Sequence, residues 1–301
     1  MVEILQAIID GVAVGGVLSL ASIGLTLIYS ILRLCSFAHG DMVTLGAYIT
    51  LSANVGLGLD MVSASALGTV GAVIFALVCD RLLWLPLRRQ RANDTTLMIT
   101  SIGLAYVIRN GIILIWGASP QRYNLPTFPP IPLGELLITR NKLLVIGASI
   151  GAIIVVGLIL QKTKIGKAMR AVADSPELAK IAGINVKATI IGTWILSTVL
   201  TALGGTMYGL IANLRPNMGW LLLLPMFTAV IMGGIGNVYG AVLGALIVGL
   251  AQEVGTVCPQ FLGANAQYCI PTDYKLGIGL LIMILVLLLR PQGLLNPRPR
   301  S

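Results

Sequence analysis

The stretch GVAVGGVLSLASIGLTLIYSIL, residues 11–32, contains neither a charged side chain nor a proline. A helix needs about 20 predominantly apolar residues to cross the hydrocarbon core of a bilayer, so this stretch is long enough to span a membrane. The N-terminus, Met-Val-Glu, lacks the basic region that opens a secretory signal. We therefore expect residues 11–32 to remain in the protein as a transmembrane helix.

The composition of the whole chain agrees with this class of fold. Of the 301 residues, 56% are hydrophobic and 10% are charged, whereas a soluble domain carries roughly a quarter charged residues. The 35 glycines fit the close approach of helices in a membrane. We predict an all-α polytopic membrane protein with a single transmembrane domain, residues 1–301, built of eight transmembrane helices and one short segment that either spans or re-enters. The predicted helices cover residues 11–32, 39–58, 61–87, 95–117, 143–161, 188–213, 239–257 and 274–290, and the short segment covers residues 221–236.

The distribution of basic residues gives the expected orientation. If the polar segment 162–187 is cytoplasmic and the helices alternate, 14 of the 20 lysines and arginines lie on the cytoplasmic side, leaving 6 outside. This excess satisfies the positive-inside rule. It places the N-terminus and the loops 118–142 and 258–273 outside, and the C-terminus in the cytoplasm. The net charge of +9 then reflects topology, and we expect no nucleic-acid partner.

A short polar helix is predicted within RAVADSPELAKIAGI, residues 170–184, between two apolar segments. Asp174 or Ser175 can cap it, Pro176 is favoured at its first position, and Gly183 is typical of the residue just past a helix end. The residues expected to contact a partner are Asp174, Ser175, Pro176, Glu177, Leu178, Lys180, Ile181 and Gly183.

Two interpretations of this helix remain open from the residues alone. Its apolar side, which carries Leu178 and Ile181, can lie on the membrane lipid as an interfacial helix. Alternatively, the same side can dock onto a cytoplasmic partner protein.

Four stretches resemble one known family along nearly the whole chain. GKAMRAVADSPELAKIAGINV (166–186) resembles the cytoplasmic coupling segment of the branched-chain amino acid (LIV-type) permeases of ABC importers. The other three are SFAHGDMVTLGAYI (36–49), FTAVIMGGIGNVYGAVLGALIVGLAQ (227–252) and LLLRPQGLL (287–295), in the family's order. The short length and the His39 context are more similar to the H-type than to the M-type subunit.

The resemblance implies a set of partners and a location. It implies a second homologous permease subunit, two ABC ATPase subunits that hold ATP and Mg, and a periplasmic amino-acid-binding protein, all at the inner membrane of a bacterium. It implies neutral or branched-chain amino acids as substrates, with urea or other small amides handled by related permeases. An apolar pathway with few fixed charges suits such a solute.

The residues themselves agree that this chain is not an enzyme. A phosphate-binding loop reads G-x-x-x-x-G-K-[ST], but Ala168 follows Gly166 and Lys167, and Gln161 stands where the first glycine belongs. The sequence also lacks metal-ligand spacing among its cysteines and its one histidine. We therefore expect ATP hydrolysis on a partner chain and no cofactor or metal in this one.

An ion-coupled secondary transporter of a small neutral solute is the alternative class. Such proteins place ionisable groups within the membrane, and Asp10, Arg109 and Glu253 are the candidates. Asp10 and Glu253 lie nearer a predicted helix end than its centre, which favours interfacial or interhelical pairs. A passive channel is a third class, in which the capped cytoplasmic helix has no role.

Six residues are candidates for the solute pathway, and each has a simpler structural explanation. The histidine can bond a neighbouring carbonyl, the polar side chains can face protein, and the glycines can either expose backbone to solute or allow close packing around a tight turn. The candidates are His39, Ser101, Asn110, Gly233, Gly234 and Gly236.

A disulfide between Cys258 and Cys269 is also expected. These two of the four cysteines share a loop that the predicted topology places outside, where disulfides persist. Two unpaired thiols near the membrane interface are the alternative. Cys35 and Cys79 fall near the cytoplasmic side and are expected to stay reduced.

Overall fold

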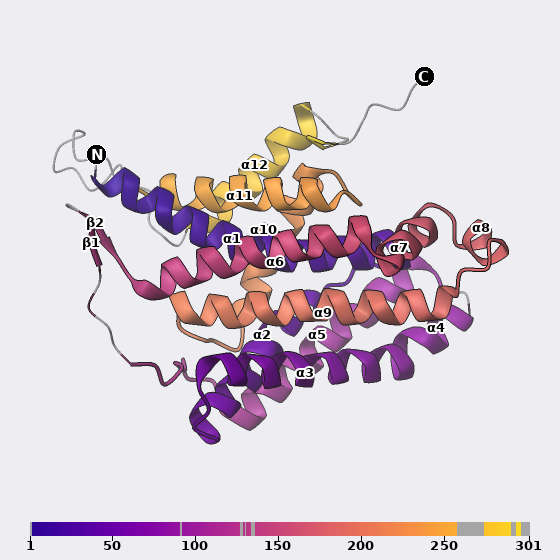
Figure 1. Ribbon diagram of the computed structural model, residues 1–301, viewed down its shortest axis with the longest axis horizontal. Coiled ribbons are helices and arrows are strands. Elements are labelled where there is room, and N and C mark those ends of the chain that lie inside the picture. The colour runs from indigo at the N-terminus through magenta and orange to yellow at the C-terminus, as the bar shows by residue number, and fades with distance from the viewer. Residues whose placement is uncertain are drawn as a thin grey trace.

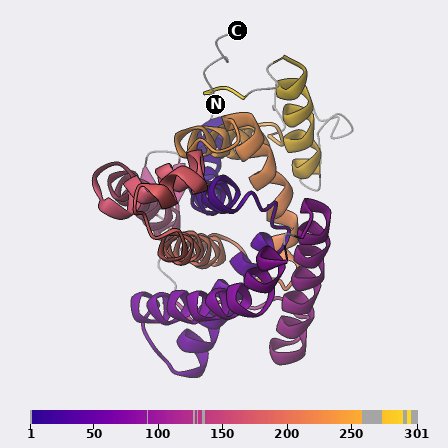
Figure 2. The same cartoon turned by 90° about the vertical axis from the view of Figure 1, so that its right-hand side faces the viewer.

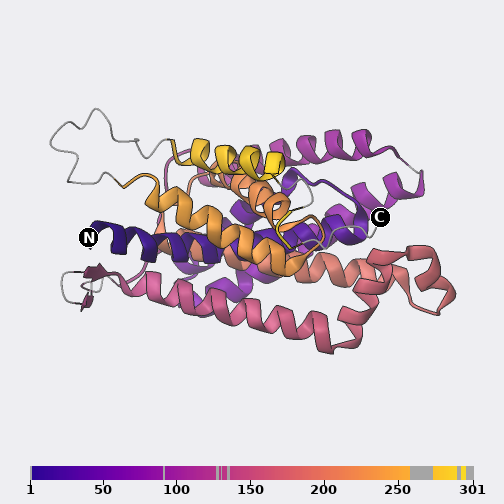
Figure 3. The ribbon, with the colours of Figure 1, turned by 90° about the horizontal axis from the view of Figure 1, so that it is seen from above.

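The computed structural model describes residues 2–90, 92–126, 129, 131–133, 136–257, 274–289 and 293–295. Its long helices lie roughly side by side (Figures 1 and 3). The N-terminus lies at one end of this bundle, and two short helices, α7 and α8, lie at the other. The elements are α1 (Val2–Leu32), α2 (Ala38–Leu51), η1 (a π-helical turn, Ser52–Gly56), α3 (Met61–Cys79), η2 (a second π-helical turn, Asp80–Trp84), α4 (Leu85–Arg89), α5 (Asp94–Trp116), β1 (Ile131–Leu133), β2 (Leu136–Ile138), α6 (Arg140–Lys162), α7 (Lys164–Asp174), α8 (Pro176–Ile181), α9 (Val186–Ile211), α10 (Met218–Gly233), α11 (Val238–Val254) and α12 (Lys275–Leu289).

Each apolar segment predicted from the sequence is helical in the structure. By length and composition, 5 helical segments of the described chain are long and apolar enough to cross a membrane. They are α1, α3 with its continuation to Arg89, α5, α6 and α9. Three shorter helices, α10, α11 and α12, are also apolar. The chain is therefore a multi-pass helical membrane protein.

Helix α1 forms the centre of the bundle, because it packs against α6, α9, α10 and α11 (Figure 2). It runs antiparallel to α11, and the two backbones approach closely where Gly11 and Gly15 face Leu250 and Leu246. Ser19 continues the contact with a hydrogen bond to the carbonyl of Val242 at 3.3 Å. Small residues in register thus let the two helices pack against each other, as is usual in membranes.

Three boundaries differ from the sequence prediction. Helix α1 begins at Val2 rather than at residue 11, because residues 2–10 continue the helix beyond the uncharged stretch although they include Glu3 and Asp10. The segment 162–187 contains two helices, α7 and α8, where one was predicted. A short antiparallel ribbon, β1 with β2, lies within the predicted loop 118–142. In the part of the chain that the structure describes, the other regular elements are helices.

Helices α2 and α10 both begin inside the bundle, against each other. The His39 side chain, in the first turn of α2, reaches Ala21, which lies roughly 16 Å from the end of α1 at 1.5 Å rise per residue. A Cβ added at Gly40 would overlap the backbone of Gly219, in the first turn of α10. The N–H of Gly219 donates to Thr44 Oγ1 at 2.9 Å. The first turns of α2 and α10 therefore pack against each other in the interior.

Candidate functional site

Helix α8 is the capped polar helix expected from the sequence. Ser175 is its N-cap, and its Oγ accepts a hydrogen bond from the N–H of Leu178 at 3.3 Å. Pro176 takes the first position, where its missing N–H costs nothing. Gly183 follows the helix with φ +81°, the left-handed conformation that glycine adopts readily. Asp174 ends the preceding helix, α7, so Ser175 is the cap.

The apolar side of α8 faces away from the body of the protein. Ala179 is buried, whereas Leu178 is 67% exposed and Ile181 is 82% exposed. Helix α7 fixes the base of this element, because its Met169 and Val172 are buried in a cluster beneath it. Helices α7 and α8 lie at one end of the bundle (Figure 1). The two exposed apolar side chains are therefore presented at that end.

The three glycines of the pathway prediction lie in a tight turn between α10 and α11. Gly233 contacts the backbone of Gly240. Gly234 and Gly236 have φ of +99° and +92°, and the side chain of Asn237 accepts from the backbone of Tyr239 at 3.1 Å to cap α11. The glycines of this turn thus allow the backbones of α10 and α11 to pack closely, and the turn also borders a cavity.

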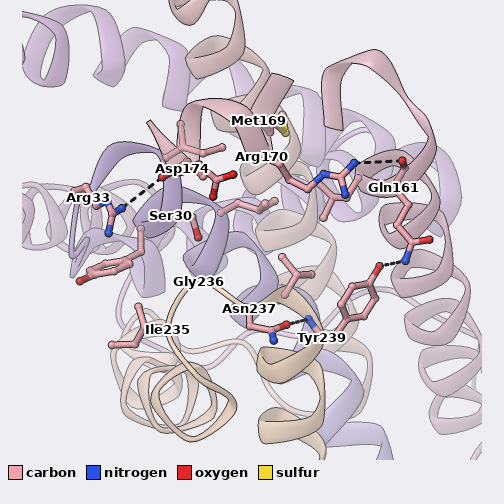
Figure 4. A pocket seen from close by; sticks show the side chains of 16 residues that line it. Ser30, Arg33, Gln161, Met169, Arg170, Asp174, Ile235, Gly236, Asn237 and Tyr239 are labelled. Carbon is pink, nitrogen blue, oxygen red and sulfur yellow. Dashed lines mark hydrogen bonds between the residues drawn. The ribbon is translucent and has the colours of Figure 1, made fainter. Parts of the chain in front are cut away.

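That cavity has a volume of about 470 Å³ and lies beside α7 (Figure 4). Arg33 and Arg170 line it, and each donates to a backbone carbonyl near α7: Arg33 to Ala173 at 3.4 Å and Arg170 to Gln161 at 3.5 Å. Asn237, from the glycine-rich turn, also lines it. The turn therefore abuts the same end of the bundle that carries α7 and α8.

Gly234→Val is expected to lower uptake sharply. Valine at φ +99° adds strain of about 1–3 kcal/mol, and Gly293 packs directly against Gly234. Uptake at equal membrane abundance is the measurement. Gly147→Val on α6 is the matched control, because a Cβ there meets nothing within 4 Å. Near-normal uptake by Gly234→Val would make this stretch an ordinary, tolerant turn.

The other pathway candidates lie apart from that turn. His39 is buried, and its Nε2 lies 2.9 Å from the carbonyl oxygen of Ala21 and 3.1 Å from Thr201 Oγ1. Ser101 is buried on α5, where its Oγ accepts a hydrogen bond from the N–H of Phe37 at 3.1 Å. This bond satisfies the backbone N–H of the residue just before α2. Asn110 is exposed further along α5 and donates to the carbonyl of Tyr106 at 2.8 Å.

All three charged residues singled out from the sequence form ion pairs between helices. Lys142 on α6 contacts Asp10 on α1 at 2.5 Å. Lys275 on α12 contacts Glu253 on α11 at 2.6 Å. An ion pair between helices is the simpler explanation for Asp10 and Glu253, and their positions in the sequence favoured it.

The third, Arg109, belongs to an arrangement that the sequence did not reveal. It bonds Asp41 with two parallel contacts, Nε to Oδ1 at 3.1 Å and Nη2 to Oδ2 at 3.0 Å. Its guanidinium lies 4.9 Å from the ring centroid of Trp220 and 5.5 Å from that of Tyr106. The available signal was Asp41 itself, since an acidic residue inside a predicted span is rare and usually functional.

The cysteines and possible metal ligands can be located only in part. Among those residues, no group of three or more His, Cys, Asp and Glu side chains could hold a metal. Cys35 and Cys79 are free thiols. The expected disulfide between Cys258 and Cys269 lies outside the described residues.

Comparison with known proteins finds a matching family and several similar proteins. The family model described as "Branched-chain amino acid transport system / permease component" matches residues 7–287. The high-affinity branched-chain amino acid transport system permease protein BraD of Pseudomonas aeruginosa is 29% identical, over 97% of this chain and 95% of that protein. Its counterpart LivH of Escherichia coli is 27% identical over the same shares.

More distant likenesses extend to other transporters. The fructose import permease protein FrcC of Rhizobium meliloti is 37% identical over 135 residues, 42% of this chain and 35% of that protein. A solved structure of PsaBC from Streptococcus pneumoniae in complex with Fab has a TM-score of 0.52 and 12% identity, over 99% of this chain and 93% of that one, which is a likeness of fold. Since the family model covers most of the chain, this protein belongs to the family of permease components of branched-chain amino acid transport systems.

Proposed function

We propose that this chain is the translocating subunit of an ATP-driven importer of neutral or branched-chain amino acids. The observation that carries the proposal is α8, a capped helix at one end of the bundle with Leu178 and Ile181 exposed, in a chain without a phosphate-binding loop. Such a chain needs another source of energy for active transport, and α8 offers a compact surface on which a partner ATPase can supply it. The printed names of the relatives support the substrate class.

The proposed assembly contains a second homologous permease subunit, two ABC ATPase subunits and a periplasmic amino-acid-binding protein. ATP and Mg belong to the ATPase subunits. The α7–α8 end faces the cytoplasm, which puts the N-terminus outside and the C-terminus in the cytoplasm. This orientation is supported by the exposed basic side chains at that end, which are Lys162, Lys164, Lys167, Arg170 and Lys180.

In this proposal α8 transmits ATP hydrolysis to the membrane helices. Its exposed apolar residues enter a groove on the ATPase, and Glu177 makes a charged contact at the rim. Helix α7 carries the motion onward, because its buried side is packed against the end of α1 through the cluster that includes Ile31 and Met169. A helix lying on lipid would not require this rigid base.

The ion-coupled alternative is less well supported. Asp10 and Glu253, two of the acidic groups suited to binding a coupling ion, are each paired with a lysine. An ion-binding carboxylate within the membrane would instead need open coordination.

The test is uptake by proteoliposomes that contain the chain with its co-expressed ATPase and second permease subunits. Labelled leucine, isoleucine, valine and alanine are supplied with the binding protein. Uptake is expected to require internal ATP and to persist when ionophores abolish proton and sodium gradients. Uptake that follows an ion gradient without ATP would contradict the proposal, and so would failure of the chain to co-purify with ATPase subunits.

A further inference from the structure

The buried pair Asp41–Arg109 is a costly feature that the coupling role of α8 does not require. Asp41 is fully buried in α2, and Arg109 on α5 is largely buried beside it. Charged groups are expensive within a membrane and usually mark a solute or ion pathway. Replacing a buried pair with apolar side chains is often neutral or stabilising, so stability alone is a weak reason for this pair.

Two partly exposed aromatic side chains flank the guanidinium of Arg109. Trp220 and Tyr106, whose rings flank the guanidinium, are 39% and 55% exposed. The hydrogen bonds that Arg109 makes to described residues use Nε and Nη2. A guanidinium has five N–H donors in a fixed fork, so Nη1 remains for a further acceptor.

This site lies where α2 and α10 begin. Asp41 is in the first turn of α2, and Trp220 is in the first turn of α10. Helix N-termini carry partial positive charge; the carboxylate of Asp41 offsets that of α2, and the start of α10 adds to the field of the arginine. Broken helices whose N-termini face an anionic group of the substrate are a recurring construction in transporters.

We propose that Arg109 binds the α-carboxylate of the amino acid as it crosses the membrane. Asp41 holds the guanidinium in place, and the exposed faces of Trp220 and Tyr106 receive the apolar side chain of the solute. The inference rests on the proposed function, and it adds a substrate-recognising residue to the permease.

The experiment measures uptake and ATP hydrolysis together in the reconstituted complex. Arg109→Lys keeps a positive charge opposite Asp41 but loses the planar fork, and Arg109→Gln loses both. Leucine uptake is expected to fall at least about tenfold in each, the equivalent of one hydrogen bond to a charged group. ATP hydrolysis stimulated by leucine-loaded binding protein is expected to stay within about twofold of wild type, because α8 is untouched. Trp220→Leu should give a smaller loss of uptake.

Structural and recognition roles are separated by the exchanged pair Asp41→Arg with Arg109→Asp. A pair that only holds helices together would regain uptake on exchange, and that result would overturn the inference. Near-normal uptake by Arg109→Lys at equal abundance would do the same, as would a parallel fall of abundance, ATP hydrolysis and uptake. If the wild-type complex transports none of the neutral amino acids tested, the proposed function itself is wrong. If the wild-type complex transports them and only the Arg109 variants behave differently from expectation, the proposed function stands and the role of Arg109 is wrong.

Discussion

Leu178→Glu is expected to abolish amino-acid uptake by the assembled importer while the permease remains inserted in the membrane. Burying an apolar side chain of this size contributes about 1.5–3 kcal/mol, and each 1.4 kcal/mol changes an equilibrium about tenfold. A glutamate in the same groove loses that contribution and adds the cost of burying a charge. ATP hydrolysis stimulated by substrate-loaded binding protein, measured beside uptake, reports the coupling directly.

Two variants serve as controls for this result. Leu178→Met keeps the apolar volume and is expected to retain coupling. Leu57→Glu adds the same charge at an equally exposed leucine, 70% accessible in the turn before α3, which the proposed orientation places on the outer side. If Leu178→Glu forms the complex and its ATPase responds normally to loaded binding protein, α8 is not the coupling element and lies instead on lipid.

The helices and the cap of α8 were predictable because they depend on local sequence. Uncharged runs locate the spans, and the order Ser175, Pro176, then Gly183 predicts a short capped helix whatever surrounds it. Helix α7 was missed although a local signal existed. Thr163 caps it by accepting a hydrogen bond from the N–H of Gly166 at 3.1 Å. If Thr163 is not recognised as a helix cap, the lysines that follow it resemble a charged loop.

The interior site was not predictable from one sequence, because its members come from three separate helices. Asp41, Arg109 and Trp220 are distant along the chain, and each has an ordinary explanation by itself. The glycines present the same difficulty. Whether Gly233 exposes its backbone to solute or packs on Gly240 depends on a neighbour that local spacing does not identify. Long-range packing therefore decides the site, while local patterns decide the elements.

Gly40→Val is expected to prevent stable assembly of the permease. A Cβ at this position would overlap the carbonyl of Gly219, and the next nearest atom is also backbone. Rotamer changes cannot relieve such an overlap, so α2 and α10 must separate at their first turns. Overpacking of a tight core typically costs about 1–3 kcal/mol of stability. An overlap with backbone atoms is expected at the upper end of this range. Membrane abundance and thermal stability in detergent measure the loss.

Gly103→Val on α5 is the matched control, because a Cβ there meets nothing within 4 Å and valine is a better helix former than glycine. It is expected to leave abundance unchanged. The reciprocal variant Gly219→Val should reproduce the defect of Gly40→Val, since its Cβ would overlap the carbonyl of Gly40. If Gly40→Val is abundant and transports normally, α2 and α10 do not begin against each other. Arg109 would then lose the arrangement that brings Asp41 and Trp220 to it, so this variant tests the foundation of the proposed carboxylate site as well as the packing.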